Sequence, residues 1–283
     1  MSNVKIAVIG AGTMGNGIAH SFAMHGFKTY LCDLNNEILK KSISIININL
    51  DRQIKKDIIS EADKNKILSR IHVATNLNSI PQEVNLVIEA ISEDKNAKLI
   101  LFRMLEGLMN EECIFASNTS AISITEMATA CRPDRFIGMH FMNPVPVMNL
   151  VEIIRGYSTS DKTYNIIKDI CVKLGKEPVC VNDYPGFVSN RVLMSLINEA
   201  IYAVYEGIAS AIDIDKVFIL GMNHPMGPLT LADFIGLDVC LNIMDVMYEG
   251  FNNPKYAPCP LLRKMVAAGK LGKKSSEGFY KYD

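Results

Sequence analysis

The sequence predicts an α/β chain with two parts, a parallel β-sheet covered by helices and then an all-helical domain. Three observations support this prediction. Short apolar runs alternate with helix-like segments, a glycine-rich turn joins the first run to the first helix, and the pattern becomes helical throughout after residue 185. The 283 residues suffice for two domains, which we place at 1–184 and 185–283.

Composition and charge exclude several classes of protein. Hydrophobic residues make up 49% of the chain and charged residues 21%, as in ordinary globular proteins. The net charge of −1 argues against a general nucleic-acid binder, and no apolar run reaches membrane-spanning length. Seven cysteines without CxxC spacing indicate a reducing compartment and no structural zinc. We therefore expect a cytoplasmic protein that binds neither nucleic acid nor membrane.

The first βαβ unit is the clearest part of the pattern. The apolar run 4–9 reads as a buried strand, 12–26 as a helix, and 29–32 as a second strand that ends at Asp33. A charged helical excursion follows over about 37–70. It reads as two helices that meet near Ser60, where the residues resemble a capping box.

Further strands are expected at 86–90, 114–116, 136–141 and 150–154. Strands that alternate with helices predict a parallel sheet with both faces covered, a Rossmann-type arrangement. After the Pro185-Gly186 turn, apolar residues recur at helical spacing to about Gly269, with breaks near 223–225 and 253–254. The domain boundary is therefore expected near residue 184.

The glycine-rich turn has the G-x-G-x-x-G pattern of a dinucleotide-binding loop. Its residues are Gly10, Ala11, Gly12, Thr13, Met14 and Gly15. The glycines allow a tight turn, a close approach of the backbone to a pyrophosphate, and close packing of helix on strand. Asp33, about 20 residues on, would accept hydrogen bonds from the ribose hydroxyls and repel a 2′-phosphate, which favours NAD over NADP. The alternative, a glycine turn of another fold with Asp33 solvated, fits this context less well.

Polar residues also follow two later strands. Ser120 lies just after the strand at 114–116, and His140 lies at the end of the strand at 136–141, before a proline-rich loop. Glu152 lies in the next strand. A histidine with a carboxylate partner is a common general base, although a structural histidine is an equally good reading of this spacing alone. The other histidines have no partner at ligand spacing, so no metal is expected.

Together these motifs resemble the 3-hydroxyacyl-CoA dehydrogenase family, most of all its bacterial 3-hydroxybutyryl-CoA members. The likeness runs essentially end to end. Besides residues 10–15 and Asp33, it rests on 87–90 (VIEA), 117–120 (SNTS), 140–148 (HFMNPVPVM), 150–152 (LVE), 185–191 (PGFVSNR), 224–228 (HPMGP), 236–238 (GLD) and 277–280 (EGFY).

The resemblance implies a role for each matching residue. His140 corresponds to the family's catalytic base and Glu152 to its partner, while Ser120 and Asn190 correspond to residues that hold the substrate. Further cofactor contacts are implied for Glu93, Lys98, Ser120, Asn143 and Lys274. Lys55 and Lys56 are candidates for the CoA phosphates, with a solvated helix face as an equally good alternative. The family's serine in that region is replaced by Asn49.

The resemblance also implies NAD as cofactor, a short (S)-3-hydroxyacyl-CoA thioester as substrate, and a homodimer formed through the helical domain. The chain departs from the family pattern at Met142, Asn149 and Ser276. Two other readings remain: a hydroxy-acid dehydrogenase that does not use CoA, and a non-catalytic NAD-binding protein. The first is disfavoured because such relatives tend to carry a lysine where this chain has Asn190-Arg191.

Overall fold

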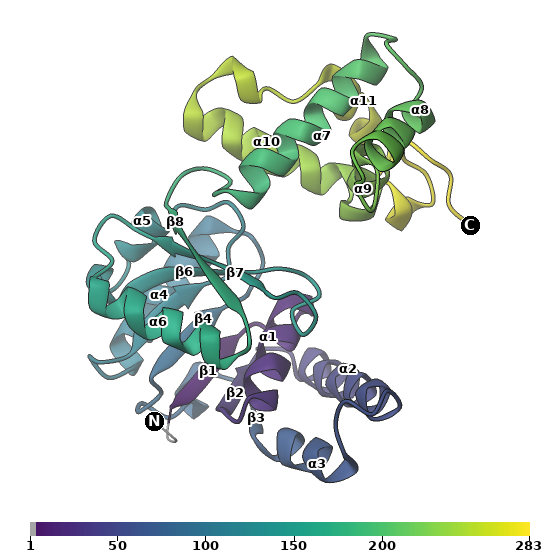
Figure 1. Cartoon of the computed structure of the whole chain (residues 1–283). Helices are drawn as coiled ribbons and strands as arrows, with labels where there is room; N and C mark the ends of the chain where they lie inside the picture. Colours follow the sequence, from purple (N-terminus) through teal and green to yellow (C-terminus); the bar gives the residue numbers. More distant parts are fainter. Residues whose placement is uncertain (1–3) are drawn as a thin grey trace. The chain divides into compact units, whose positions relative to one another are not determined.

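The computed structural model describes residues 4–283, which form two compact units divided between Asp183 and Tyr184 (Figure 1). The first unit contains one eight-stranded sheet with the strand order β3-β2-β1-β4-β5-β6-β7-β8. Its strands are β1 (Lys5–Ile9), β2 (Lys28–Cys32), β3 (Ile71–Ala74), β4 (Leu86–Glu89), β5 (Ile114–Ser117), β6 (Phe136–Phe141), β7 (Leu150–Arg155) and β8 (Glu177–Asn182). The order reverses between β1 and β4, which is the place where open α/β sheets bind their ligands.

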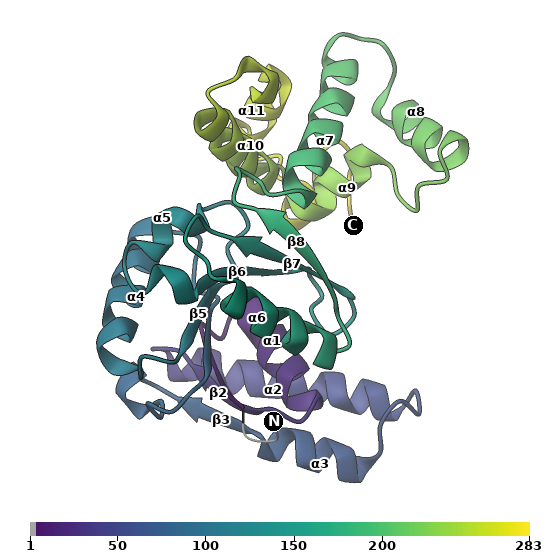
Figure 2. The ribbon, with the colours of Figure 1, turned by 60° about the vertical axis from the view of Figure 1, so that its left-hand side comes forward.

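Helices cover both faces of this sheet (Figure 2). They are α1 (Thr13–Met24), α2 (Asn36–Ile54), α3 (Glu61–Ser69), α4 (Lys95–Leu108), α5 (Ile124–Ala128) and α6 (Asp161–Lys173), with short 3₁₀ turns at Leu77–Ser79 and Pro133–Arg135. Alternate strand residues face opposite sides. On one side α1 and α6 pack in a single core with Ile6 and Val8. On the other side Phe102 of α4 contacts Phe115 and Phe136, with ring centroids 6.1 and 4.7 Å apart. The expected α/β fold with two covered faces is confirmed.

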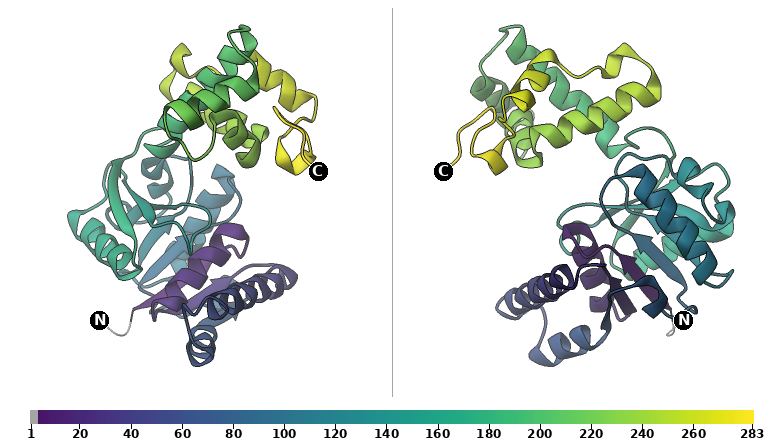
Figure 3. Two further views of the ribbon diagram at one scale, coloured as in Figure 1. Left: turned by 45° about the vertical axis from the view of Figure 1, so that its right-hand side comes forward. Right: turned by 180° about the vertical axis from the view of Figure 1, so that it is seen from behind.

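The helical excursion forms a small core of its own. Helices α2 and α3 pack against α1, and Figure 3 shows the long α2 beside it. Ala23, Ile46, Leu50 and Ile67 fill the space between the three helices. Ser60 caps α3 through the capping box that the sequence predicts, with Asp63 as the reciprocal partner.

One strand pair differs from the expected parallel arrangement. β7 runs antiparallel to β6, while the other six pairs are parallel. Only residues 142–149 connect β6 to β7, which is too short for a crossover helix. Strands β3 and β8 were not expected at all. Both lie at an edge of the sheet and are largely exposed, so they lack the apolar run that marks a buried strand.

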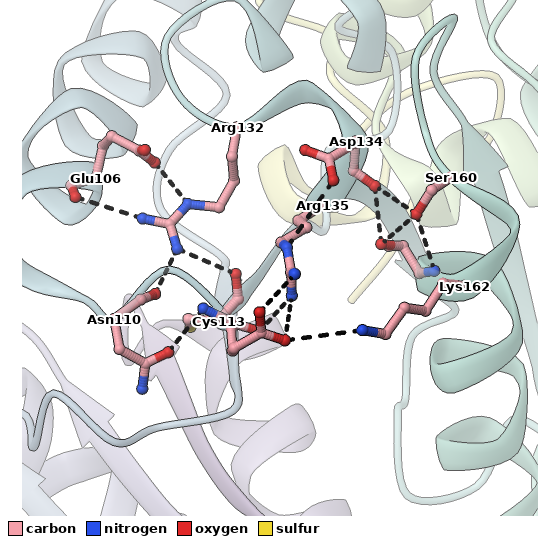
Figure 4. A network of polar contacts seen from close by, with 10 residues as sticks. Glu106, Asn110, Cys113, Arg132, Asp134, Arg135, Ser160 and Lys162 are labelled. Atoms are coloured by element: carbon pink, nitrogen blue, oxygen red, sulfur yellow. Dashed lines mark hydrogen bonds and ion pairs between the residues drawn. The ribbon is translucent and has the colours of Figure 1, made fainter.

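An arginine fixes the amino-terminal end of the sheet to α4 (Figure 4). Arg132 Nε donates to Glu106 Oε2 at 2.7 Å, and its Nη atoms donate to carbonyls of the last turn of α4 and the loop after it. The guanidinium also lies 4.7 Å above the Phe115 ring. Arg135, nearby, pairs with the exposed carboxylate of Glu112. Arg132 therefore caps a helix, whereas Arg135 makes a surface ion pair.

The second unit is helical and is held together partly by two buried aspartates. Asp215 accepts hydrogen bonds from Leu229 N and Thr230 N, and Asp233 accepts from Phe279 N and Tyr280 N. The Asp215 bonds join residues 211–216 to the helix that begins at Pro228, and the Asp233 bonds fasten the carboxyl-terminal segment to that same helix. The helices are α7 (Ser189–Tyr205), α8 (Ala211–Lys216), a π-helical turn at Val217–Gly221, α9 (Pro228–Ile235), α10 (Leu237–Phe251) and α11 (Pro260–Ala267), with 3₁₀ turns at Pro254–Tyr256 and Lys273–Ser275.

We expect Arg132→Lys to lower the free energy of unfolding by about 2 kcal/mol, because the Arg132 side chain is only 10% exposed and lysine cannot reproduce its several hydrogen bonds to the end of α4 and the loop after it. Arg135→Lys is the matched control and should cost much less, since an exposed ion pair contributes little. Urea unfolding of both variants measures the difference. Equal losses would show that Arg132 does not cap α4 in the way described.

His20 should make the protein sensitive to acid. It is fully buried on α1, and neither ring nitrogen has a hydrogen-bond partner within the described residues. Burial, with a smaller contribution from His25, lowers the pKa of His20 from 6.5 to about 4. In the unfolded chain His20 binds a proton below about pH 6.5, whereas in the folded chain it stays neutral down to about pH 4. The free energy of unfolding therefore falls as the pH falls through this window.

This effect amounts to about 3 kcal/mol between pH 7 and pH 4. The variant His20→Leu should remove that part of the pH dependence, whereas His72→Gln, at a more exposed position, should leave it nearly unchanged. Urea unfolding at a series of pH values measures both. A slope in His20→Leu equal to that of the parent protein would contradict the assignment.

Candidate active site

The glycine-rich loop brings three backbone segments into close contact at the carboxyl end of β1. Gly10 has a φ of 101°, and a Cβ there would lie 2.4 Å from the carbonyl oxygen of Ala90. A Cβ on Gly15 would lie 1.8 Å from the carbonyl oxygen of Gly10. Any side chain at either position would therefore push β1, α1 and the segment after β4 apart.

The amino terminus of α1 is suited to an anionic group. Its N-cap, Gly12, makes no side-chain capping bond, and the first turn holds no acidic residue. A Cβ on Gly12 would meet nothing within 4 Å, so there is open space beside the backbone. The first N–H groups of the helix and its partial positive charge can therefore hold a pyrophosphate. These features fit NAD.

Asp33, directly after β2, is attached to the glycine-rich loop. Its Oδ2 accepts a hydrogen bond from Ala11 N at 2.9 Å, and its Oδ1 accepts one from Asn35 N at 3.0 Å. The carboxylate is thus held by two backbone N–H groups, one in the glycine-rich loop and one at Asn35, the N-cap residue of α2. A carboxylate in this position can accept bonds from ribose hydroxyls and repels a 2′-phosphate.

His140 and Glu152 form a hydrogen-bonded pair across two strands. They lie directly opposite each other in the antiparallel β6–β7 pair, so the register places their side chains on the same face. His140 Nδ1 lies 2.8 Å from Glu152 Oε2, and the two residues are only 6% and 2% exposed. Because a carboxylate can only accept, Nδ1 carries the proton and Nε2 is the basic nitrogen of the neutral ring. This is the arrangement of an oriented general base.

Hydrogen bonds draw the segment after β5 to the ends of β4 and β6. Asn118 Oδ1 accepts a bond from Phe141 N at 3.0 Å, directly after His140. Glu93 Oε1 accepts a bond from Ser120 N at 2.9 Å. The structure thus places Ser120, His140 and Glu93 along the carboxyl ends of adjacent strands, with Asn143 in the loop that follows β6.

Lys98, for which the family resemblance implies a cofactor contact, is buried and forms ion pairs with two carboxylates. Its side chain is 1% exposed and its Nζ lies 2.6 Å from Glu89 Oε1 and 3.0 Å from Glu93 Oε2. Burial raises the pKa of Glu89 against the opposing effect of Lys98. Burial also acts to raise the pKa of Glu93, but Lys98 and the bonds from residues 119 and 120 outweigh it, so that pKa is lowered.

The sequence interpretation missed two buried residues beside the site. Glu89 belongs to a motif that supported the family resemblance, yet no role was expected for it. Lys176 follows α6 and donates from Nζ to the carbonyls of Val145 and Met148 at 2.6 Å, which holds the β6–β7 loop. A charged residue inside an apolar run was a usable signal for Glu89, whereas nothing in the sequence around Lys176 marks it as buried.

The remaining predicted site residues lie on other elements. Asn190 is in the first turn of α7, and Lys274 forms an ion pair with Asp238; both belong to the second unit. Lys55 and Lys56 follow α2 and are exposed. Within residues 4–283, no group of three or more His, Cys, Asp or Glu side chains is placed to hold a metal ion. No helix of the described chain is long and apolar enough to span a membrane.

The chain matches two family descriptions over nearly its whole length. Residues 5–184 match "3-hydroxyacyl-CoA dehydrogenase, NAD binding domain", and residues 186–282 match "3-hydroxyacyl-CoA dehydrogenase, C-terminal domain".

Individual relatives agree with this match. The chain is 53% identical over 280 residues to a probable 3-hydroxybutyryl-CoA dehydrogenase of Deinococcus radiodurans, covering 99% of this chain and 100% of that protein. It is 44% identical to the human mitochondrial hydroxyacyl-coenzyme A dehydrogenase, over 98% of this chain and 90% of that protein. The crystal structure of (S)-3-hydroxybutyryl-CoA dehydrogenase from Ralstonia eutropha superposes with a TM-score of 0.96 at 46% identity, covering 99% of both chains. The chain therefore belongs to the 3-hydroxyacyl-CoA dehydrogenase family.

Proposed function

We propose that the chain interconverts (S)-3-hydroxybutyryl-CoA and acetoacetyl-CoA. As a family member it is an NAD-dependent 3-hydroxyacyl-CoA dehydrogenase. The short acyl chain is supported by relatives from Deinococcus radiodurans, Bradyrhizobium diazoefficiens and Bacillus subtilis, which are 51–53% identical and are named 3-hydroxybutyryl-CoA dehydrogenases. The observation that carries the mechanism is the buried His140–Glu152 pair on β6 and β7, next to β5.

In the proposed mechanism His140 moves the proton. In oxidation, Nε2 takes the proton of the C3 hydroxyl, and the Glu152 carboxylate stabilises the imidazolium that forms. When bound, NAD supplies the hydride acceptor. In the reverse direction the imidazolium returns the proton to the C3 oxygen. The hydrogen bond between Nδ1 and Glu152 keeps the ring oriented in both directions.

The other predicted residues would bind and orient the substrate and the cofactor. Ser120 and Asn190 would hold the substrate, while residues 10–15, Asp33, Glu93 and Asn143 would contact the cofactor. Lys98 and Lys274 are further candidates for cofactor contacts. Lys56, exposed after α2, would bind a CoA phosphate.

The helical unit 185–283 would contribute to substrate binding and form a homodimer. An apolar hollow between α7 and α8, lined by residues such as Leu196, Ala200 and Ala203, supports this role. Exposed apolar side chains lie on the same helices and the π-helical turn, including Val192, Ile212 and Leu220. A cytoplasmic location is supported by the seven cysteines, all of which are free thiols.

The reaction is tested by the loss of NADH absorbance with acetoacetyl-CoA, using free acetoacetate for comparison. We expect turnover of the thioester alone. His140→Gln should reduce kcat by about 10²–10⁴-fold while leaving NADH binding intact, because it removes the general acid–base. His72→Gln, on edge strand β3, is the control and should retain activity. Turnover of free acetoacetate would argue against a CoA enzyme, and a mild loss in His140→Gln would refute the role of His140.

Asp33→Ser should relax the preference for NAD. Removing the carboxylate removes the repulsion of a 2′-phosphate, so kcat/KM for NADPH relative to NADH should rise by roughly tenfold or more. The absolute affinity for NADH should fall, because the bond from Ala11 N is also lost. Asp161→Ser, at the exposed start of α6, is the control. An unchanged cofactor ratio would show that Asp33 does not face the ribose.

A further inference from the structure

Glu89 is a buried carboxylate for which the proposed reaction gives no role. It is 0% exposed, so it cannot touch a ligand. Its Oε1 accepts bonds from Lys98 Nζ at 2.6 Å and Ile91 N at 2.7 Å, and its Oε2 accepts one from Ser117 Oγ. A buried carboxylate is costly even when paired, so its presence at the end of β4 calls for an explanation.

Lys98 connects Glu89 to the surface. Its Nζ contacts Glu89 on one side and, at 3.0 Å, Glu93 on the other, whose side chain is 35% exposed. Glu93 Oε1 in turn accepts from Thr119 Oγ1 and Ser120 N. The hydrogen bonds of Glu89 described above are all donated to it, by an ammonium, a backbone N–H and a hydroxyl, which is the pattern of an ionised carboxylate. With Glu89 and Glu93 ionised and Lys98 protonated, this trio carries a net charge of −1. The nearby Lys95 and Glu126 form an exposed ion pair and cancel each other.

The position of the trio relates it to one half of the cofactor. In sheets of this order a dinucleotide lies across the reversal point, with one mononucleotide over each half of the sheet. The uncapped amino terminus of α1 suits the pyrophosphate and Asp33 suits the adenosine ribose, both on the β1–β2 side. The nicotinamide half then lies at the ends of β4 and β5, where Glu89 and Ser117 lie. Gly10 packs against Ala90, the residue directly after Glu89.

The nicotinamide ring is a cation in NAD⁺ and neutral in NADH, so a fixed charge beside it distinguishes the two forms. We propose that Glu89, with Lys98 and Glu93, sets a net negative charge under the nicotinamide half-site and thereby strengthens binding of NAD⁺ relative to NADH. The inference rests on the proposed function, in which NAD binds at the carboxyl ends of strands β1, β4 and β5. A unit charge about 10 Å away, at an effective dielectric constant of about 20, changes a dissociation constant by roughly tenfold.

The variant Glu89→Gln tests this proposal because the side-chain shape is kept while the charge is removed. The amide oxygen can still accept from Lys98 and Ile91, and the amide nitrogen can donate to Ser117 Oγ. The trio changes from −1 to 0. We expect the Kd for NAD⁺, measured by titration calorimetry at fixed ionic strength, to rise by roughly tenfold. The Kd for NADH should change little, and so should the Kd for ADP-ribose, which lacks the nicotinamide.

A double variant distinguishes the effect of the net charge from the effect of changing the Glu89 side chain. Glu89→Gln with Lys98→Met replaces the buried ion pair by a neutral pair of similar size and leaves Glu93, so the trio again carries −1. The ratio of the two dissociation constants should return toward that of the parent protein. Glu112→Gln, on the exposed surface before β5, is the control for loss of a carboxylate elsewhere. Thermal unfolding checks that each variant is folded.

An unchanged ratio in Glu89→Gln would overturn the proposal. An equal weakening of NAD⁺, NADH and ADP-ribose would also overturn it, since that result indicates a structural role. If Glu89→Gln does not fold, a ratio in the double variant that differs from that of the parent protein would still contradict the charge argument. Failure of the parent protein to bind either cofactor would instead refute the assignment of the NAD site on which the inference rests.

Discussion

The close approach of three backbone segments around Gly10 is the constraint on which the architecture depends. The carbonyl of Gly10 leaves no room for a side chain on Gly15, and Ala90 leaves none on Gly10. This contact joins β1, α1 and the end of β4 at the point where the strand order reverses. The same three segments belong to the proposed cofactor site, so the packing of the sheet also determines the backbone geometry of that site.

Buried charges, rather than apolar packing alone, arrange the segments that extend from this point. Glu89 and Lys98 hold the ends of β4 and β5, and Lys176 holds the β6–β7 loop by its carbonyls. Backbone groups that leave a sheet need hydrogen-bond partners when they are buried, and charged side chains provide strong ones. Asp215 and Asp233 serve the same purpose in the helical unit. Hydrogen bonds to buried charges thus help to fix the loops near the site, in addition to apolar packing such as that of Val145.

Local sequence patterns predicted much of the fold and the position of the glycine-rich loop. Gly10, Gly12 and Gly15 occur at a diagnostic spacing, and the capping box at Ser60 is contained within four residues. The edge strands β3 and β8 were not predicted because exposed strands lack an apolar run. The antiparallel pairing of β6 with β7 was not predicted because a strand pattern alone does not show the direction in which the strand pairs. The Glu89–Lys98–Glu93 trio was not predicted because an ion pair depends on which elements meet in space. The chemical roles of His140 and Glu152 stay predictions.

The short β6–β7 connection also bears on how the site is assembled during folding. His140 and Glu152 are 12 residues apart in sequence, whereas Asp33 and Ala11 are 22 apart and Glu93 and Ser120 are 27 apart. Closing a shorter loop costs less chain entropy, so contacts of low sequence separation form more readily. The His140–Glu152 pair therefore belongs to a local hairpin that can order before the rest of the sheet. The Asp33–Ala11 and Glu93–Ser120 contacts, in contrast, form only when more distant parts of the chain meet.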